Sequence, residues 1–182
     1  MQRKIPGLIV AAMLFGAVAA NPAAAQARGY IGFGPGVSLP VGDFGDVAKT
    51  GWLGQVFGGI TGASGMFGGR VDGMYVRHSL EVPDASTALI GANADLVVSP
   101  GSAGSKVRPY ILGGVGFFNS KTEVGSVEGE GQTNFAYNLG GGLLFKAGRM
   151  GIFVEARYIS VSTDPSSQGF IPIAIGLRFG GN

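Results

Sequence analysis

The chain has no cysteine and only one histidine among its 182 residues, and charged side chains make up 13% of it. Without cysteine there is no disulfide framework and no lipoprotein anchor. A metal site would have to rest on oxygen ligands, and no spaced cluster of carboxylates is present. The sequence therefore predicts no metal and no cofactor, and folding must depend on hydrogen bonds and packing.

A run long enough for a transmembrane helix is missing as well. The uncharged stretch at residues 8–20 is shorter than the roughly 20 apolar residues that a spanning helix needs, and Pro22 follows it closely. Two basic residues precede the stretch, and residues 25–27 (Ala-Gln-Ala) offer the small-residue pattern of a signal peptidase site. We predict that residues 1–27 are a cleaved secretion signal and that residues 28–182 form one domain.

An excess of charge of one sign also disappears once this signal is removed. Arg3 and Lys4 are two of 13 Lys and Arg residues, which leaves 11 basic residues against 11 acidic ones. A neutral chain lacks the basic surface that nucleic acids attract. We therefore expect no nucleic-acid partner.

Glycine, by contrast, is abundant, with 35 residues, far above its ordinary share of about 7%. No Gly-X-Y period is present, which excludes collagen, and an apolar content of 46% is too high for a disordered chain. Glycine within strands indicates backbones in close contact or a lumen too narrow for larger side chains.

Segment after segment alternates bulky apolar residues with glycine, polar or charged ones, which is the two-residue period of a β-strand. In the last segment one face carries Ile171, Ile173, Ile175, Leu177 and Phe179, and the other carries Pro172, Ala174, Gly176 and Arg178. Eight such strands are predicted, at residues 30–39, 52–62, 66–80, 87–98, 107–118, 134–145, 150–161 and 171–179.

The second of these strands fits the period least well. Apolar residues occupy both of its faces, with Trp52 and Val56 on one and Leu53 and Phe57 on the other. This pattern is consistent with a bulge at Gly58-Gly59 that switches the register.

Two features indicate that the strands stand in a membrane. The longer connections, at residues 40–51, 81–85, 120–133 and 162–168, collect most of the acidic side chains, whereas Lys106, Arg108, Lys146 and Arg149 lie at the opposite ends. Outward aromatic residues fall at two depths, as in the girdles of outer-membrane barrels. Because an open sheet edge is excluded in hydrocarbon, we predict an all-β, eight-stranded antiparallel up-and-down transmembrane β-barrel.

A barrel of eight strands has an interior that its own side chains just fill. The inward parity collects three charges of each sign: Arg70, Asp72, Asp95, Glu155, Arg157 and Arg178. Buried charges must be paired, so we predict one neutralised structural cluster that plugs the lumen and prevents conduction. A proton path and a solute site are the alternatives.

Two further side chains are candidates for chemistry. His78 is predicted to be a polar lumen residue, with a pH switch or a catalytic base as alternatives. Its neighbour Ser79 points to the opposite face, so the two cannot form a nucleophile and base pair. Arg77 has outward parity at the rim, where it either contacts lipopolysaccharide phosphates or simply extends its charge into water.

Four stretches together carry a family resemblance: 29–43 (GYIGFGPGVSLPVGD), 70–75 (RVDGMY), 108–117 (RPYILGGVGF) and 176–179 (GLRF). The chain resembles the outer-membrane β-barrel domain family, the small opacity-type and attachment-type barrels of Gram-negative envelopes. The resemblance implies export through the periplasm and insertion into the outer membrane by the barrel-assembly machinery. It also implies contact with outer-membrane lipid and lipopolysaccharide, and loops that in some relatives touch host surfaces.

From these observations we predict a monomeric, non-enzymatic, structural component of the outer membrane with acidic extracellular loops. One alternative is an adhesin or binding module that contacts a host or extracellular ligand through the acidic loop, with Lys121, Glu123, Glu128 and Glu130 as its surface. A second alternative is a lipid-modifying outer-membrane enzyme.

Overall fold

A computed structural model of the chain describes residues 27–101, 104–125, 127–163 and 167–181. All of the predicted secretion signal except Ala27 lies outside these residues, so its cleavage stays a prediction. Within the described ranges, no helix has both the length and the apolar character needed to cross a bilayer.

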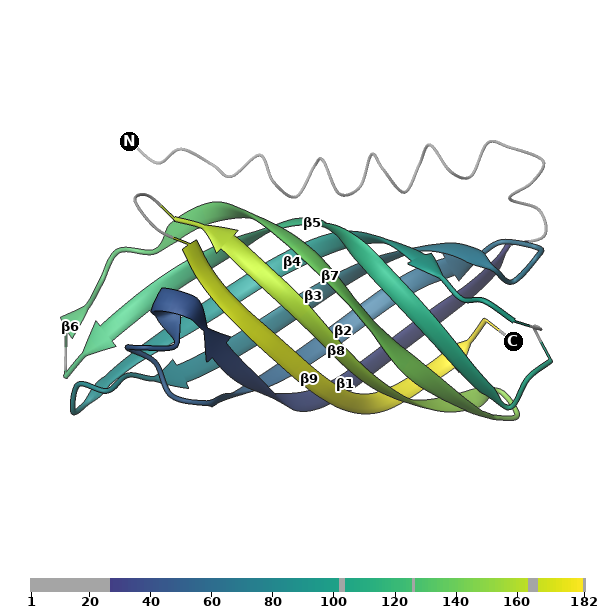
Figure 1. Ribbon diagram of the computed structural model, residues 1–182, viewed down its shortest axis with the longest axis horizontal. Helices are drawn as coiled ribbons and strands as arrows, with labels where there is room; N and C mark the ends of the chain where they lie inside the picture. Colours follow the sequence, from purple (N-terminus) through teal and green to yellow (C-terminus); the bar gives the residue numbers. More distant parts are fainter. Residues whose placement is uncertain (1–26, 102–103, 126, 164–166, 182) are drawn as a thin grey trace.

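Eight long antiparallel strands form a closed barrel, as predicted (Figure 1). They are β1 (Arg28–Val41), β2 (Gly51–Thr61), β3 (Phe67–Ser79), β4 (Ala85–Val98), β5 (Val107–Val124), β7 (Gln132–Ala147), β8 (Met150–Ser162) and β9 (Ser167–Gly180). A short 3-10 helix, η2 (Gly42–Phe44), and the two-residue strand β6 (Val127–Glu128) complete the described elements. Each long strand pairs with the next, and β1 pairs with β9, so the wall formed by the eight long strands has no open edge.

The faces follow the predicted parity, with apolar side chains on the outside. Leu139 and Ile31 are 67% and 65% exposed, and many other outward Ile, Val, Leu and Phe side chains are exposed as well. A water-soluble protein rarely exposes such a continuous apolar surface. This exterior is suited to hydrocarbon.

The predicted bulge in β2 is wrong. The strand pairs with β1 and β3 in unbroken register, from Thr61 opposite Arg28 to Gly51 opposite Ser38. Leu53 and Phe57 are buried in the lumen. Leu53 and Phe57 face inward because parts of the lumen are packed with apolar side chains. The apolar residues on both faces of β2 therefore need no change of register.

The predicted loop at residues 120–133 is also wrong for most of its length. β5 continues to Val124, which pairs with Ala85, and β7 begins at Gln132, opposite Ser120. β6 pairs with the end of β5, so the hairpin extends beyond β8 and β9 and lies level with the β3–β4 connection (Figure 1). The alternation of apolar residues stops there because both faces of the extension lie outside the apolar belt.

The two ends of the barrel differ in charge. We call the end with η2 and the β5–β7 hairpin the loop end, and the end where β1 begins and β9 finishes the terminal end (Figure 1). The loop end holds the acidic residues Asp43, Asp46, Glu81, Asp84, Glu123 and Glu130. The terminal end holds the basic residues Arg28, Lys106, Arg108, Lys146, Arg149 and Arg178.

Outward aromatic rings lie near both ends of the strands. Trp52 and Tyr75 are in contact near the loop end, with ring centroids 5.2 Å apart. Phe33 stacks on Phe179 near the terminal end, at 6.3 Å. Aromatic rings at two depths match the two interfaces of a bilayer.

Candidate functional site in the barrel lumen

Arg157 of β8 is the centre of a buried ionic network. Its Nη1 donates to Asp72 Oδ1 at 2.8 Å and to Asp95 Oδ2 at 3.1 Å, and its Nε donates to Glu155 Oε1 at 2.8 Å. The Arg157 side chain is 1% exposed. These side chains point inward from β3, β4 and β8, so they meet across the lumen.

Arg70 is the second guanidinium of the network. Its Nη1 and Nη2 donate to the two oxygens of Glu155 at 2.6 and 3.3 Å, a bidentate pair that joins residues 85 positions apart. The Tyr110 hydroxyl donates to Glu155 Oε2 at 2.8 Å. Such two-point contacts hold both side chains in one orientation.

Amide side chains complete the carboxylate shell. Asn93 donates to Asp72 at 2.9 Å, and Asn138 donates to Asp95 at 2.8 Å. All three buried carboxylates therefore accept hydrogen bonds from more than one residue. This degree of satisfaction is what makes buried charge tolerable.

The structure brings together five of the six charged residues that the sequence places in one cluster. Arg178 is the exception, and its inclusion was wrong. Its Cζ lies 3.7 Å from the centre of the Tyr30 ring, near the terminal end. The five-residue network thus has two cations against three anions, in place of the predicted balance.

Apolar layers enclose the network on both sides. Toward the loop end lie Met74, Val76, Leu89, Phe118, Ile159, Val161 and Phe170, and toward the terminal end lie Phe57, Leu144 and Phe153. The prediction of a polar lumen therefore holds for the ionic network and for groups near each end, such as His78 and Arg108, but not for the apolar layers between them. The periodic pattern could not reveal this difference, because parity assigns a face without assigning a depth.

His78 closes the lumen near the loop end. Its Nε2 lies 3.2 Å from Ser38 Oγ, and its Nδ1 lies 2.9 Å from the Lys49 carbonyl oxygen. Phe44 of η2 folds over it, with ring centroids 5.2 Å apart. The side chain is therefore an inward, buried group as expected, but Ser38, its partner, was not found from the sequence.

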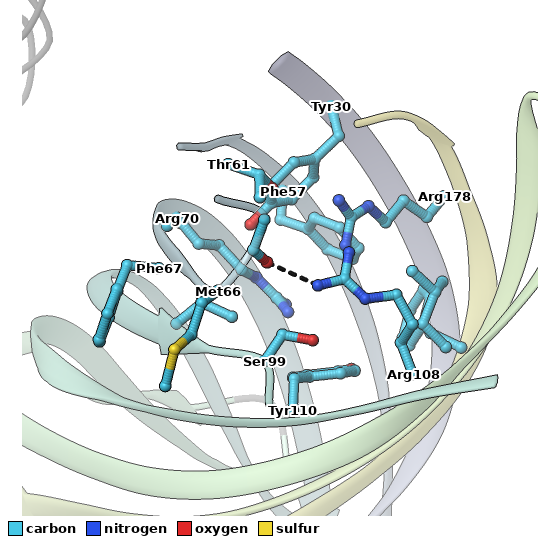
Figure 2. Close-up of a pocket in the computed structure, with 15 residues that line it drawn as sticks. Tyr30, Phe57, Thr61, Met66, Phe67, Arg70, Ser99, Arg108, Tyr110 and Arg178 are labelled. Carbon is cyan, nitrogen blue, oxygen red and sulfur yellow. Dashed lines mark hydrogen bonds between the residues drawn. The ribbon is translucent and has the colours of Figure 1, made fainter. Parts of the chain in front are cut away.

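A small pocket lies inside the terminal end and brings together Arg70, Arg108 and Arg178 (Figure 2). Arg108 Nη2 donates to the Gly65 carbonyl oxygen at 2.6 Å. Sequence reasoning treated Arg108 as a charge at the strand end. Its parity, shared with the inward Tyr110, was the signal that could have placed it in the lumen.

The remaining predicted residues lie at the loop-end rim. Arg77 Nη2 donates to Glu123 Oε2 and to Ser86 Oγ, both at 3.0 Å. Lys121 and Glu123 belong to β5, Glu128 belongs to β6, and Glu130 is exposed in the connection to β7. Among the described residues, no group of three or more His, Asp or Glu side chains is arranged to hold a metal ion.

Comparison with known proteins gives one family and several similar structures. The sequence model of one family, described as the outer membrane protein beta-barrel domain, matches residues 8–179 of this chain. Neisserial surface protein A superposes with a TM-score of 0.67 at 14% identity, over 83% of this chain and 96% of that chain. Ail, the attachment invasion locus protein of Yersinia pestis, superposes with a TM-score of 0.55 at 18% identity, over 85% of this chain and 99% of that chain.

A major outer membrane protein from Thermus thermophilus also gives a TM-score of 0.55, at 10% identity, over 85% of this chain and 99% of that chain. The comparison with curated protein sequences yields no match. At these identities the similar structures establish a common fold.

Proposed function

The chain belongs to the outer membrane protein beta-barrel domain family, and from this premise we propose that it is a closed, non-enzymatic, monomeric structural barrel of the outer membrane. Barrels of this kind turn their longer loops to the outside of the cell and their short turns to the periplasm. The acidic loop end then faces outward, among lipopolysaccharide. The basic terminal end faces the periplasm.

The observation that carries this proposal is the filled lumen. Arg157 bridges side chains from three strands, and apolar layers cover the network above and below. An ion that crossed would have to displace both the network and these layers. A structural role requires only that the barrel be stable and sealed.

Conductance measurements test the proposal. The folded wild-type barrel is reconstituted into planar bilayers, with a general porin as the positive control. We expect no stepwise current. Reproducible channels from pure protein would contradict the closed barrel.

The contact between Ser38 and His78 bears on the enzymatic alternative. A serine beside a histidine resembles a nucleophile and its base. Both residues are 0% exposed, however, and Phe44 packs on the His78 ring. A lipid ester has no access to this pair, which favours the non-enzymatic proposal. Release of fatty acid from lipopolysaccharide or phospholipid by wild-type protein, but not by Ser38→Ala, would overturn it.

The β5–β7 hairpin favours an adhesin as the second candidate function. It projects at the loop end and carries Glu123 and Glu130. A solved structure of Ail contains the heparin analogue sucrose octasulfate. On this chain the loop end has more acidic than basic side chains, so a cationic surface suits it better than a sulfated one.

Deletion of residues 121–131, with a two-residue Asn-Gly turn in their place, tests the adhesin. It removes everything beyond the last β5–β7 pair, Ser120 with Gln132, including Lys121, Glu123 and β6. If the hairpin is the contact surface, binding of nanodisc-embedded barrel to host cells or matrix falls to background after the deletion. A Lys106→Gln variant, altered at the terminal end, is the matched control and should bind like the wild type.

A further inference from the structure

The pocket at the terminal end contains positive charge that no carboxylate of the described residues balances. Arg108 and Arg178 both line it, and neither forms a salt bridge with any described residue. The three lumen carboxylates are already engaged by Arg70 and Arg157.

Unused hydrogen-bond donors point to the same place. The Nε groups of Arg108 and Arg178 are buried and have no acceptor among the described residues. Arg108 is only 4% exposed, so bulk water does not compensate its Nε. A buried donor without a partner is uncommon in folded proteins and indicates a missing ligand or ordered solvent.

The other donors of the pocket are mostly occupied. Tyr110 donates its hydroxyl proton to Glu155, and Ser99 donates to the Pro109 carbonyl oxygen. The Tyr30 ring stacks beneath the Arg178 guanidinium and holds it in the pocket (Figure 2). The free edges of two guanidiniums are therefore the main recognition groups.

The size of the cavity limits the ligand. Its volume is about 30 Å³, enough for roughly two water-sized spheres. This volume suits a chloride ion, or the oxygens at one end of a phosphate whose remainder extends toward the terminal end. An organic anion such as gluconate has a hydroxylated chain too large for this volume, and only its singly charged carboxylate end can enter.

We propose that the terminal end of the barrel binds one compact anion, chloride or the oxyanion end of a phosphate, between Arg108 and Arg178. The anion supplies the charge that these two guanidiniums lack, and it accepts from their Nε groups. Asp72, Asp95 and Glu155 lie deeper in the lumen and repel an anion, so the site binds without conducting. The proposal does not depend on whether the loop end acts as an adhesin.

Thermal unfolding of the barrel in a zwitterionic detergent tests the site. Sodium chloride, sodium phosphate and sodium gluconate are compared at equal ionic strength, with gluconate as the anion too large for the cavity. We expect a saturable rise in the unfolding midpoint with chloride or phosphate relative to gluconate. The anion that saturates at the lower concentration identifies the ligand.

Two variants separate site binding from general salt effects. Arg178→Gln should lose the anion-specific rise, whereas Arg149→Gln, an exposed arginine at the same end, should keep it. Isothermal titration of the wild-type barrel with each anion gives a result even if Arg178→Gln does not fold. Absence of binding by both anions, or an undiminished rise in folded Arg178→Gln, overturns the proposal.

Discussion

At the scale of single residues, Arg157 matters most because three carboxylates share it. Asp72, Asp95 and Glu155 each accept from its guanidinium, and all four side chains are almost completely buried. Removing one partner from a buried ionic network leaves the others charged and unpaired. The network therefore makes stability depend strongly on this one position.

Replacement of Arg157 by glutamine is expected to lower the free energy of unfolding by about 3–5 kcal/mol, the usual cost of breaking a buried ion pair. Urea titration of the barrel in detergent measures the change. Arg149→Gln removes the same charge from an exposed turn and should change stability by less than about 0.5 kcal/mol. Equal effects in both variants would show that the network is not what stabilises the lumen.

The ion pair of Arg77 and Glu123 is expected to contribute little to stability, in contrast to the Arg157 network. Their side chains are 42% and 38% exposed at the rim, so water screens the attraction. Glu123→Gln should reduce the free energy of unfolding by no more than about 1 kcal/mol. A loss near that of Arg157→Gln in the same urea titration would mean that the hairpin is anchored far more tightly than its exposure indicates.

At the scale of the strands, inward glycines allow neighbouring backbones to approach. A Cβ on Gly176 of β9 would meet the Phe33 carbonyl oxygen and lie 2.6 Å from Gly34 Cα. A Cβ on Gly54 of β2 would meet nothing within 4 Å. The abundance of glycine thus reflects steric need at some positions and not at others.

Gly176→Ala is expected to destabilise the barrel by about 1–3 kcal/mol, because the strands must separate to admit the methyl group. Gly54→Ala is the matched control and should change stability by less than about 0.5 kcal/mol. Comparison of the heat-induced mobility shift of the two folded variants on gels measures the difference. Similar unfolding temperatures would argue against close backbone packing at Gly176.

At the scale of the whole molecule, the distribution of charge gives the barrel a direction. Acidic side chains gather at the loop end and basic ones at the terminal end, with the ionic network between them. The chain belongs to a family of outer-membrane barrels, and the outer surface of its barrel is apolar. Both observations support a membrane-spanning arrangement. Orientation in the membrane then decides which end meets the outside.

Because the chain contains no cysteine, single cysteines can report that orientation. We expect Glu130→Cys, at the loop end, to react with a membrane-impermeant maleimide on intact cells. Lys106→Cys, at the terminal end, should react only after the outer membrane is permeabilised. Labelling with the reverse pattern would place the acidic end in the periplasm.

The structure also shows how far parity reasoning extends. The two-residue period assigned Leu139 outward and Arg157 inward, because a strand turns alternate side chains to opposite faces. It failed beyond the apolar belt, where β5 and β7 continue with polar residues on both faces. There the sequence carries no hydrophobic contrast, and only strand pairing shows that the segment is extended.

By itself, the sequence determined the fold class, the number of long strands and the face of most of their residues, since all three follow from a local period and from the exclusion of open edges in lipid. The tertiary structure decided which inward side chains meet. Arg157 reaches Asp95, 62 positions away, whereas Arg178 stacks on Tyr30 and leaves the network. Contacts across a barrel depend on strand tilt and stagger, which are properties of the closed sheet and not of any one segment.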